Sequence, residues 1–414
     1  PDTDDLIFQI NDWYIPESDK SIEHYKRIDG YSQDDIPPEY DIFMFGVTET
    51  GNSVCAKVIG FESFPYEKEV HSLIADAMPP RTTTMEQVCI LDTKIGQEFA
   101  RAADAINKKF NFAADLIVSH GQTLFHWIGS DNKAKGTLQL GEPTWIAQKT
   151  GVAVLSNVRS RDVAAGGHGA PLVSVLDQLM FGDSESPQGA LNLGGISNIT
   201  VASRNMAPLA YDIGPANGLL DAAIMAFTKS AEKYDKNGEL ASQGSVNESI
   251  LNQMLAHPYY SLPWPKSTGK EIFHLPYIIE HFGEVSTWKI QDVLATLLEL
   301  TVETVARDVE THQLTTLYVA GGGTNNAFMM KRLATRLTRC SVKLMSDLGV
   351  DPRAKEGLMF ALIGFLSAHG LAGAIPSCTG ASSAEILGSF TPGAKPLSLP
   401  KLVTSFPKKL VMKN

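Results

Sequence analysis

Two predicted strand hairpins constrain the fold of this 414-residue chain more than any other feature of the sequence. The first hairpin spans residues 42–61 around a polar turn, and the second spans residues 190–201 and breaks at a Gly-Gly pair. Each hairpin begins a strand-rich block that is followed by segments with helical spacing of apolar residues, such as 93–110 and 290–312. We therefore expect an α/β protein with two related halves, although the halves are too dissimilar in sequence to be called a repeat.

The length of the chain predicts two domains, because single hydrophobic cores seldom grow beyond about 250 to 300 residues. We expect domain I over residues 41–150, with the C-terminal residues 376–414 returning to it, and domain II over residues 151–375. Residues 1–40 are acidic and contain prolines, so we predict an irregular N-terminal extension there.

Charge and cysteine usage exclude several classes of function. The formal net charge is −11 and the basic residues form no stripe, which argues against nucleic acid or an anionic membrane surface as a partner. The four cysteines are widely spaced, so neither a zinc site nor a disulfide framework is indicated. The N-terminal residues lack the pattern of a signal peptide, and we expect reduced thiols and a cytoplasmic location. The apolar stretch 357–375 contains glycines and a histidine, which predicts a packed core helix and not a membrane span.

The segment 157–172, NVRSRDVAAGGHGAPL, carries the first candidate for chemistry. Asp162 follows two arginines, Arg159 and Arg161, and precedes the glycine-rich residues 166–169. Nearby cations favour the ionised form of a carboxyl, and glycines let the backbone approach a ligand closely. Two interpretations stay open on spacing alone: an ionised acid presented to a ligand, or an Asp that caps a helix beside solvated arginines.

Four further polar residues have both a functional and a structural interpretation. His120 and Gln122 follow the apolar run 114–118, where polar groups at a strand end could bind a sugar hydroxyl or simply be satisfied and half-buried. Asp212 could hold a phosphate-bound metal or cap the turn that follows it. Glu356 begins the 357–375 helix, where a carboxylate also complements the helix dipole.

Three glycine-rich turns lie at 194–195, 214–218 and 321–323, between predicted strands and helices. None matches GxGxxG or GxxxxGK[ST], so neither a Rossmann dinucleotide site nor a P-loop is supported. A strand, a glycine turn and a helix N-terminus together can bind an anion or a nucleotide. The turn at 321–323, followed by the predicted helix 328–337, has this form.

Eight segments, in order, carry a resemblance that covers roughly residues 88–393. They are VSHGQTLFHW (118–127), LQLGEPTWIAQKTGVAV (138–154), RSRDVAAGGHGAPL (159–172), LNLGGISNIT (191–200), DIGPANGLLDA (212–222), PWPKSTGKEIF (263–273), VAGGGTNNAFM (319–329) and TGASSAEILGSFTPG (379–393). The chain resembles the anhydro-N-acetylmuramic acid kinase family, of which levoglucosan kinase is a close relative. The resemblance implies the actin/hexokinase-like ATPase fold, with two domains of mixed sheets that bind ATP between them. It also implies phosphorylation of a 1,6-anhydro sugar on O6, with addition of water across the anhydro bridge.

The resemblance implies roles for individual residues. Asp162 matches the family's catalytic aspartate, the general base on the attacking water. The motifs expected around the sugar contain His120, Gln122, Arg161, Gly169, Ala170 and Pro171. Those expected around ATP contain Gly194, Gly195, Asn198, Asp212, Gly214, Asn217, Gly321, Gly322, Gly323 and Asn326. Glu356 and Asp212 are expected near Mg²⁺, which is implied because phosphoryl transfer needs charge neutralised on the β- and γ-phosphates.

One segment departs from the family pattern. The family opens with SGTSxDGxD after a strand, and the segment matched to it here is 47–55, with Thr48 and Ser53 in place of glycines and Asn52 in place of aspartate. Glu49 adds a negative charge where phosphates are expected. Two functions therefore stay open: an ATP-dependent kinase of an anhydro sugar, or a pseudokinase or sugar-binding regulatory protein that has lost ATP phosphate binding. The sequence does not choose between anhydro-N-acetylmuramic acid and levoglucosan, and relatives of this kind are often homodimers.

Overall fold

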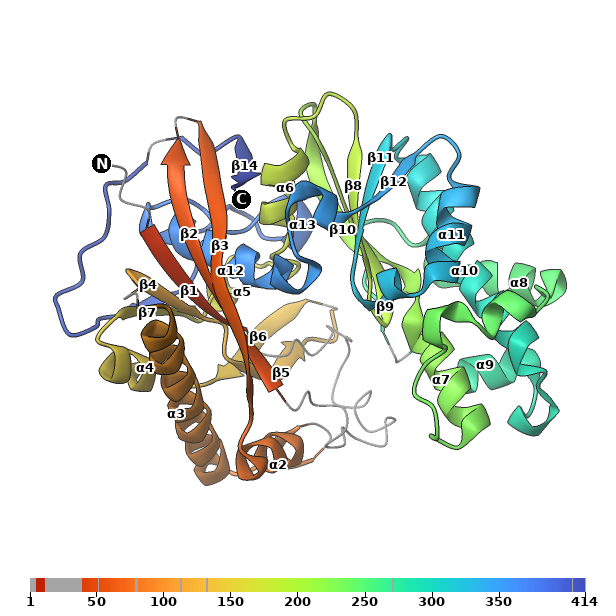
Figure 1. The fold of residues 1–414 in the computed structure, drawn as a ribbon, viewed down its shortest axis with the longest axis horizontal. Coiled ribbons are helices and arrows are strands. Elements are labelled where there is room, and N and C mark those ends of the chain that lie inside the picture. Colours follow the sequence, from red (N-terminus) through yellow and green to blue (C-terminus); the bar gives the residue numbers. More distant parts are fainter. Residues whose placement is uncertain are drawn as a thin grey trace. The chain divides into compact units, whose positions relative to one another are not determined.

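The computed structural model describes residues 5–11, 39–50, 52–78, 81–111, 114–131, 133–269, 272–403 and 405–413 (Figure 1). The described residues form two compact units. The first contains residues 5–11, 39–180 and 353–413, and the second contains residues 181–352.

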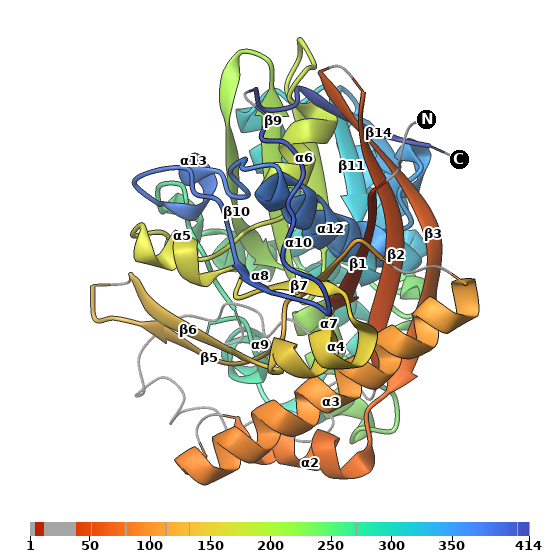
Figure 2. The same ribbon diagram turned by 90° about the vertical axis from the view of Figure 1, so that its left-hand side faces the viewer.

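The first unit is built on a sheet with the strand order β13-β7-β4-β1-β2-β3-β14. The central strands β1, β4 and β7 are parallel, whereas β2 is antiparallel to both β1 and β3. The strands are β1 (Asp5–Asn11), β2 (Glu39–Thr50), β3 (Ser53–Pro65), β4 (Leu116–Ser119), β7 (Ala153–Ser156), β13 (Ser389–Thr391) and β14 (Lys409–Met412). A separate hairpin of β5 (Gln122–Ile128) and β6 (Ala134–Leu140) lies beside helix α5 (Figure 2).

Helices cover both faces of this sheet. The helices are α2 (Lys68–Ala77), α3 (Met85–Phe110), α4 (Pro143–Thr150), α5 (Ser160–Ala164), α6 (Ser174–Phe181), α12 (Lys355–Ala368) and α13 (Pro376–Thr379). Helix α3 begins at a capping box formed by Thr84 and Gln87, and its apolar residues share a core with Ile42 and Met44 of β2. The alternate residue of β2, Phe43, is also buried, and α12 contacts β1, β2 and β4. A strand that is buried on both faces explains the unbroken apolar run in β2.

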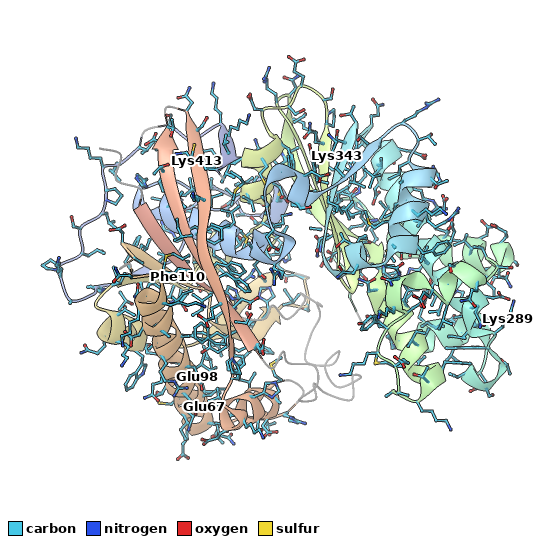
Figure 3. The ribbon with its side chains drawn as sticks, in the orientation of Figure 1. Glu67, Glu98, Phe110, Lys289, Lys343 and Lys413 are labelled. Atoms are coloured by element: carbon cyan, nitrogen blue, oxygen red, sulfur yellow. The ribbon has the colours of Figure 1, made fainter. Side chains whose placement is uncertain are left out.

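Polar residues of α3 connect the helix to the start of β2. Glu98, labelled in Figure 3, is buried. It pairs with Arg101 at 2.7 Å and accepts a hydrogen bond from the hydroxyl of Tyr40. Buried charges are tolerated when they are paired in this way.

The N-terminal hairpin differs from its predicted place. We predicted that residues 1–40 are an irregular extension and that the hairpin around 47–55 stands where the family's phosphate loop stands. Instead β1 lies between β2 and β4, with Ile10 level with both Ile42 and Ser119, and with Asp5 level with Val47. The 50–53 turn therefore lies at the end of the sheet where β4 begins, whereas His120 follows the end where β4 stops. Ligands bind outside the carboxyl ends of parallel strands, so Glu49 does not lie at that end. Residues 12–38, between β1 and β2, lie outside the described residues.

The second unit has a five-stranded sheet with the order β10-β9-β8-β11-β12. Strands β8 (Gln188–Leu193), β9 (Ile196–Ser203) and β10 (Met206–Pro215) form an antiparallel meander, and β11 (Thr316–Ala320) is parallel to both β8 and β12 (Ser341–Leu344). The order third, second, first, fourth, fifth also describes β3-β2-β1-β4-β7 of the first unit. Two units with this shared order confirm the predicted actin/hexokinase-like fold.

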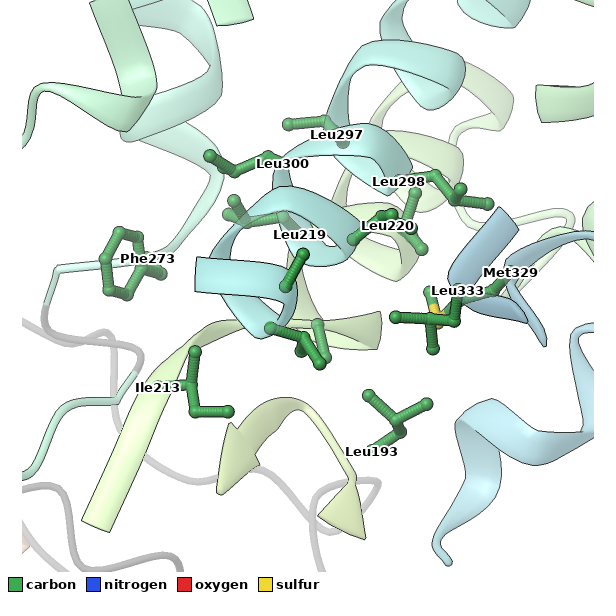
Figure 4. Packing of buried hydrophobic residues seen from close by; sticks show 14 of the residues in the cluster. Leu193, Ile213, Leu219, Leu220, Phe273, Leu297, Leu298, Leu300, Met329 and Leu333 are labelled. Carbon is green, nitrogen blue, oxygen red and sulfur yellow. The ribbon is translucent and has the colours of Figure 1, made fainter. Parts of the chain in front are cut away.

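The helices of the second unit bury one core around α10. They are α7 (Asn217–Thr228), α8 (Glu248–Leu255), α9 (Leu275–Phe282), α10 (Ile290–Thr311) and α11 (Ala327–Arg336). Figure 4 shows Leu298 of α10 in the same cluster as Leu220 of α7 and Leu333 of α11. Leu193, at the end of β8, belongs to the same cluster, so the core supports the turn that follows β8.

The units divide at residues 180/181 and 352/353, and not at the predicted 150/151 and 375/376. The reason is strand pairing, because β7 hydrogen-bonds to β4 and brings the following residues into the first unit. Helix α12 joins the same unit through its contacts with β1, β2 and β4. Across the part of the chain that the structure describes, none of the helices has the length and apolar character that a bilayer crossing requires.

Candidate functional site

Asp162 lies in α5, just beyond the carboxyl end of β7, and its side chain is almost fully buried, with 1% exposed. Its Oδ1 accepts a hydrogen bond from Thr379 Oγ1 at 2.8 Å, and its Oδ2 accepts one from the Gly169 N–H at 2.8 Å. Burial raises the pKa of Asp162, and these two hydrogen bonds oppose the rise. A carboxylate with a raised pKa and two fixed oxygens is suited to take a proton from a bound water.

The glycine-rich loop after α5 is shaped around this carboxylate. A Cβ at Gly167 would collide with Asp162 Oδ2, so only glycine fits there. The backbone of His168 donates to Thr379 O at 2.8 Å, and Ser382 N donates to Ala165 O at 2.9 Å. The loop is therefore held by the segment around α13, which the chain reaches some two hundred residues later.

Arg159 and His120 form a buried pair beside the loop. Arg159 Nε lies 2.7 Å from His120 Nε2, and Arg159 Nη1 donates to Gly169 O at 2.7 Å. A guanidinium cannot accept a hydrogen bond, so Nε2 of His120 is the acceptor and its proton is on Nδ1. Burial, with the charge of Arg159, lowers the pKa of His120 well below its usual range. His120 is thus a neutral imidazole.

Buried polar atoms without a hydrogen-bond partner gather in one stretch of the first unit. Among the described residues they include Ser119 Oγ, His120 Nδ1, Gln122 Oε1 and His126 Nε2. Burial lowers the pKa of His126 to about 4, and the charges of Arg159 and His168 act in the same direction. Buried polar groups are normally paired, so a run of such atoms beside Arg159 indicates a site that a polar ligand completes.

Glu356, in the first turn of α12, belongs to the same group of residues. Burial raises the pKa of Glu356 to about 7, and the charge of Arg159 opposes the rise. The charge of Arg159 therefore lowers the pKa values of Glu356, His120 and Asp162. The neighbouring Lys355 points elsewhere, with its Nζ 2.9 Å from the buried carboxylate of Asp177.

The two arginines beside Asp162 lie in different surroundings. Arg161, which was predicted to bind the sugar, has 61% of its side chain exposed and pairs with Glu385 at 3.2 Å. Arg159, which sequence analysis noted only as a nearby cation, is the buried guanidinium of the group. Of the other predicted sugar residues, Gly169 contacts both Asp162 and Arg159, Ala170 is buried, and Pro171 O accepts from Ser174 Oγ at 2.8 Å.

Sequence reasoning also missed Thr379 and His126 as individual residues, although both fall inside segments that carry the resemblance. The only available signal was their membership of those segments, because neither belongs to a pattern of spacing with a chemical meaning of its own.

In the second unit, the three predicted glycine turns come together. The N–H groups of Asn217 and Gly218 donate to the carbonyls of Gly194 and Gly195, each at 3.0 Å. Asn217 Nδ2 donates to Leu193 O at 3.1 Å. The turn after β8 and the start of α7 are thus one hydrogen-bonded structure.

The third turn packs against the same end of β8. Gly321 has φ of +88°, and a Cβ there would lie 2.5 Å from Asn192 Oδ1 and 2.8 Å from Leu193 O. A Cβ at Gly323 would lie 2.6 Å from Leu193 Cβ, and one at Gly322 would lie 4.0 Å from Asn217 Nδ2. Backbone brought this close, at the ends of β8 and β11, forms a surface of glycines suited to phosphate groups.

A row of polar residues crosses the sheet beside these turns. Asn192 of β8, Asn198 of β9 and Asp212 of β10 are direct cross-strand neighbours and are all half-buried. Asp212 Oδ2 accepts hydrogen bonds from Ser267 Oγ at 2.8 Å and from Thr268 N at 3.0 Å. Asn192 was not predicted as a site residue, although its pairing with Asn198 places it on the same face.

Gly214 and Asn326 each have a structural role, in close packing and in helix capping respectively. A Cβ at Gly214 would lie 2.8 Å from the ring of Tyr260, which explains the absence of a side chain. Asn326 Oδ1 accepts a hydrogen bond from Met329 N at 2.9 Å and caps α11.

A cavity of about 410 Å³ lies against α10 and α11 in the second unit. Phe328, Val246 and Ala295 form part of its apolar lining. The ion pair of Arg332 and Glu299, at 2.6 Å, also lines the cavity. Because Phe328 follows the 321–326 turn in α11, the cavity and the glycine surface lie on the same segment of chain.

The donor set allows a magnesium ion that phosphates help to hold. Within the described ranges, no group of three or more His, Cys, Asp or Glu side chains could bind a metal by itself. Mg²⁺ usually keeps several waters and takes only one or two carboxylates when phosphates are also bound. Asp212 in the second unit and Glu356 in the first unit are each a single carboxylate of this kind.

The sequence model of the anhydro-N-acetylmuramic acid kinase family matches residues 47–393. The anhydro-N-acetylmuramic acid kinase of Streptomyces coelicolor is 47% identical over 361 residues, which cover 87% of this chain and 92% of the relative. That of Rhodococcus erythropolis is 45% identical over 368 residues, with coverage of 87% and 92%. That of Photobacterium profundum is 36% identical over 387 residues, with coverage of 90% and 100%.

Proposed function

Because the chain belongs to the anhydro-N-acetylmuramic acid kinase family, we propose that it transfers the γ-phosphoryl group of ATP to O6 of 1,6-anhydro-N-acetylmuramic acid while water opens the anhydro bridge. The observation that carries this proposal is the buried Asp162 carboxylate, held by Thr379 and Gly169 beside polar atoms that lack partners. Such a site can hold a sugar and place a water against a base.

The reaction balances with Asp162 as the only base. The water oxygen bonds to the anomeric carbon, its proton passes to Asp162, and the bond between that carbon and O6 breaks. O6 bonds to the γ-phosphorus, and the bond between this phosphorus and the bridging oxygen breaks to release ADP. Each oxygen of Asp162 accepts one hydrogen bond in the structure and retains a second lone pair for the water.

His120 and Arg159 orient the sugar in this proposal. The Nδ1–H of His120 donates to a sugar hydroxyl, since Arg159 occupies Nε2. Gln122 supplies the acceptor Oε1, which has no partner within the described residues. A substrate that satisfies both atoms recovers the free energy that their burial without partners costs.

The nucleotide is bound in the second unit. The glycine turns 194–195 and 321–323 bind the phosphates through backbone N–H groups, residues 216–218 support the first turn by donating their N–H groups to its carbonyls, and the cavity lined by Phe328 takes the base. Asp212 would hold Mg²⁺ together with phosphate oxygens and water. When bound, Mg²⁺ neutralises charge on the β- and γ-phosphates.

The alternative of a pseudokinase rests on the divergent 47–55 segment, with Thr48 and Ser53 in place of glycines, Asn52 in place of aspartate, and Glu49 as an added charge. The register of β1 with β2 and β4 places the 50–53 turn at the opposite end of the sheet from His120, which bears on the position of Glu49 alone, so the pseudokinase stays the second candidate. Levoglucosan as the substrate, the homodimer and the cytoplasmic location stay predictions.

The proposal is tested by incubating the protein with Mg-ATP and 1,6-anhydro-N-acetylmuramic acid and by following ADP and sugar 6-phosphate together. Levoglucosan in a parallel reaction identifies the preferred sugar, and water enriched in ¹⁸O shows whether the solvent oxygen enters at the anomeric carbon. The Asp162→Asn variant should lose turnover by about 100-fold or more with little change in sugar affinity. Sugar binding without ATP binding in calorimetry, and without product, would instead establish the pseudokinase.

A further inference from the structure

One segment of the second unit holds Asp212 by both its backbone and its carboxylate. We call residues 258–268 the strap; it begins with the 3-10 helix η4 (Pro258–Ser261). Tyr259 Oη donates to Asp212 O at 2.7 Å, and Asp212 N donates to Lys266 O at 3.0 Å. Ser267 Oγ and Thr268 N both donate to Asp212 Oδ2. The orientation of this carboxylate is therefore set by the strap.

Lys266 bonds to the carbonyls of two other residues of the strap. Its Nζ donates to Tyr260 O at 3.2 Å and to Tyr259 O at 3.4 Å, and lies 4.8 Å from the centre of the Tyr259 ring. Burial lowers the pKa of Lys266, and the charge of Asp308 on α10 opposes that change. An ammonium that is half-buried over an aromatic ring and bonded to two carbonyls fixes the path of the backbone between them.

Trp264 attaches the strap to the other face of β10. Its ring stacks on Tyr211 with centroids 5.6 Å apart and lies 4.5 Å from the ring of His312. Tyr211 precedes Asp212 in β10, and successive side chains of a strand point to opposite faces. The strap thus contacts β10 on both sides of one peptide unit, which limits rotation of Asp212.

We propose that Lys266 is a positioning residue that, through the strap, holds the Asp212 carboxylate in the orientation required for a magnesium-bound nucleoside triphosphate. This rests on the proposed function, in which Asp212 lies near that ion. None of the strap's hydrogen bonds to Asp212 comes from a group that touches the nucleotide in the proposal. The strap's effect on binding therefore acts only through Asp212. Groups that orient a metal-binding carboxylate in this indirect way typically contribute about 10- to 100-fold to affinity or activity.

The test compares Lys266→Met with Lys289→Met in the full-length protein. Lys289, labelled in Figure 3, is exposed and pairs with Asp292 at 2.9 Å, so the control removes the same charge without removing a hydrogen bond of the strap. Hydrogen–deuterium exchange of peptides covering 209–215 reports on the Asp212 N–H directly. Calorimetry with Mg-ADP, and separate KM values for Mg-ATP and for the sugar, report on the nucleotide site.

We expect Lys266→Met to raise exchange in 209–215 and to weaken Mg-ADP binding and raise the KM for Mg-ATP by about 10-fold or more. The KM for the sugar should stay unchanged, and Lys289→Met should match the wild type. Lys266→Arg, which keeps the charge and the donors, should recover most of the affinity. If Lys266→Met folds poorly, Ser267→Ala removes a single hydrogen bond from Asp212 and should still raise the KM for Mg-ATP alone.

Three outcomes overturn the proposal and are distinguishable. If the wild type binds Mg-ADP and Lys266→Met binds it equally well while exchange rises, the strap does not position Asp212 for the nucleotide. If the wild type binds no Mg-ADP, the proposed function fails, and the positioning role fails with it. Equal increases in both KM values would indicate a general structural defect and would also contradict the proposal.

Discussion

Thr379 donates a hydrogen bond to Asp162 across a sequence separation of 217 residues, with Oγ1 and Oδ1 2.8 Å apart. The threonine belongs to α13 and the aspartate to α5, so the candidate base is assembled from two distant parts of the first unit. Because burial raises the pKa of Asp162 and this hydrogen bond opposes the rise, the hydroxyl favours the ionised form that a base requires.

Thr379→Val should therefore raise the pKa of Asp162. A base must be ionised to act, so the acidic limb of the kcat profile should move to higher pH, because a hydrogen bond to the ionised group is lost. Thr379→Ser keeps the hydroxyl and serves as the control. The pH dependence of kcat measures the effect, and an acidic limb that stays in place would contradict the assignment of Asp162 as the base.

Arg159→Met and Arg161→Met should differ sharply. Arg159→Met leaves His120 Nε2 and Gly169 O buried without a donor, which should lower the free energy of unfolding by about 2 to 4 kcal/mol and remove activity. Arg161→Met loses one exposed ion pair and should cost about 0.5 kcal/mol. Denaturant unfolding of the two variants compares them, and equal losses would refute the distinction between the arginines.

Glu356 should make the protein less stable as the pH rises. Burial raises its pKa to about 7, whereas the unfolded value is about 4.3. The native state then binds more protons than the unfolded state between these values, so the free energy of unfolding falls as pH increases through this window.

Glu356→Gln removes this dependence. Relative to wild type, the variant should be more stable by about 3.5 kcal/mol at pH 8 and nearly equal at pH 4, as measured by urea unfolding. Glu86→Gln, which changes an exposed glutamate at the start of α3, is the matched control. The same stability difference at both pH values for Glu356→Gln would show that its carboxyl is not desolvated.

Gly321→Ala should lower the stability of the second unit and its binding of Mg-ADP more than Gly283→Ala does. Gly283 has a similar φ, +74°, but a Cβ there would meet only Thr287 Oγ1 at 3.8 Å. Gly283→Ala should therefore cost about 2 kcal/mol for the backbone alone, because φ of +74° with ψ of −168° is a conformation that essentially only glycine adopts. Gly321→Ala should cost about 3 kcal/mol, because its Cβ also meets the backbone of Leu193. Thermal unfolding and Mg-ADP calorimetry compare the variants, and preserved binding in Gly321→Ala would argue against phosphates at this turn.

Elements that depend on local preferences could be predicted. The predicted helices 93–110 and 290–312 lie in α3 and α10, because apolar residues at helical spacing must share a buried face. The hairpin at 190–201 became β8 and β9, broken at the Gly-Gly pair as expected. The resemblance carried the remaining site residues, since the spacing of glycines alone does not distinguish a phosphate turn from a packing turn.

Elements that depend on distant partners could not be predicted. Nothing in the short run that forms β1 indicates that it pairs with β2 on one side and with β4 on the other. The first hairpin was consequently assigned to the wrong place in the sheet, and Glu49 to the wrong end of it. Register between strands is set by packing across the whole sheet, which a local pattern does not contain.

The sequence by itself determined the family, the three glycine turns and Asp162 as the candidate base, because motif order and residue type are properties of the chain. Only the tertiary structure decided which arginine faces His120, that Thr379 holds Asp162, and that the strap holds Asp212. Residues two apart on a helix point to different sides, and the burial that separates Arg159 from Arg161 exists only once the loop closes over the first of them. Hydrogen bonds between distant segments arise in the same way, from which surfaces folding brings together.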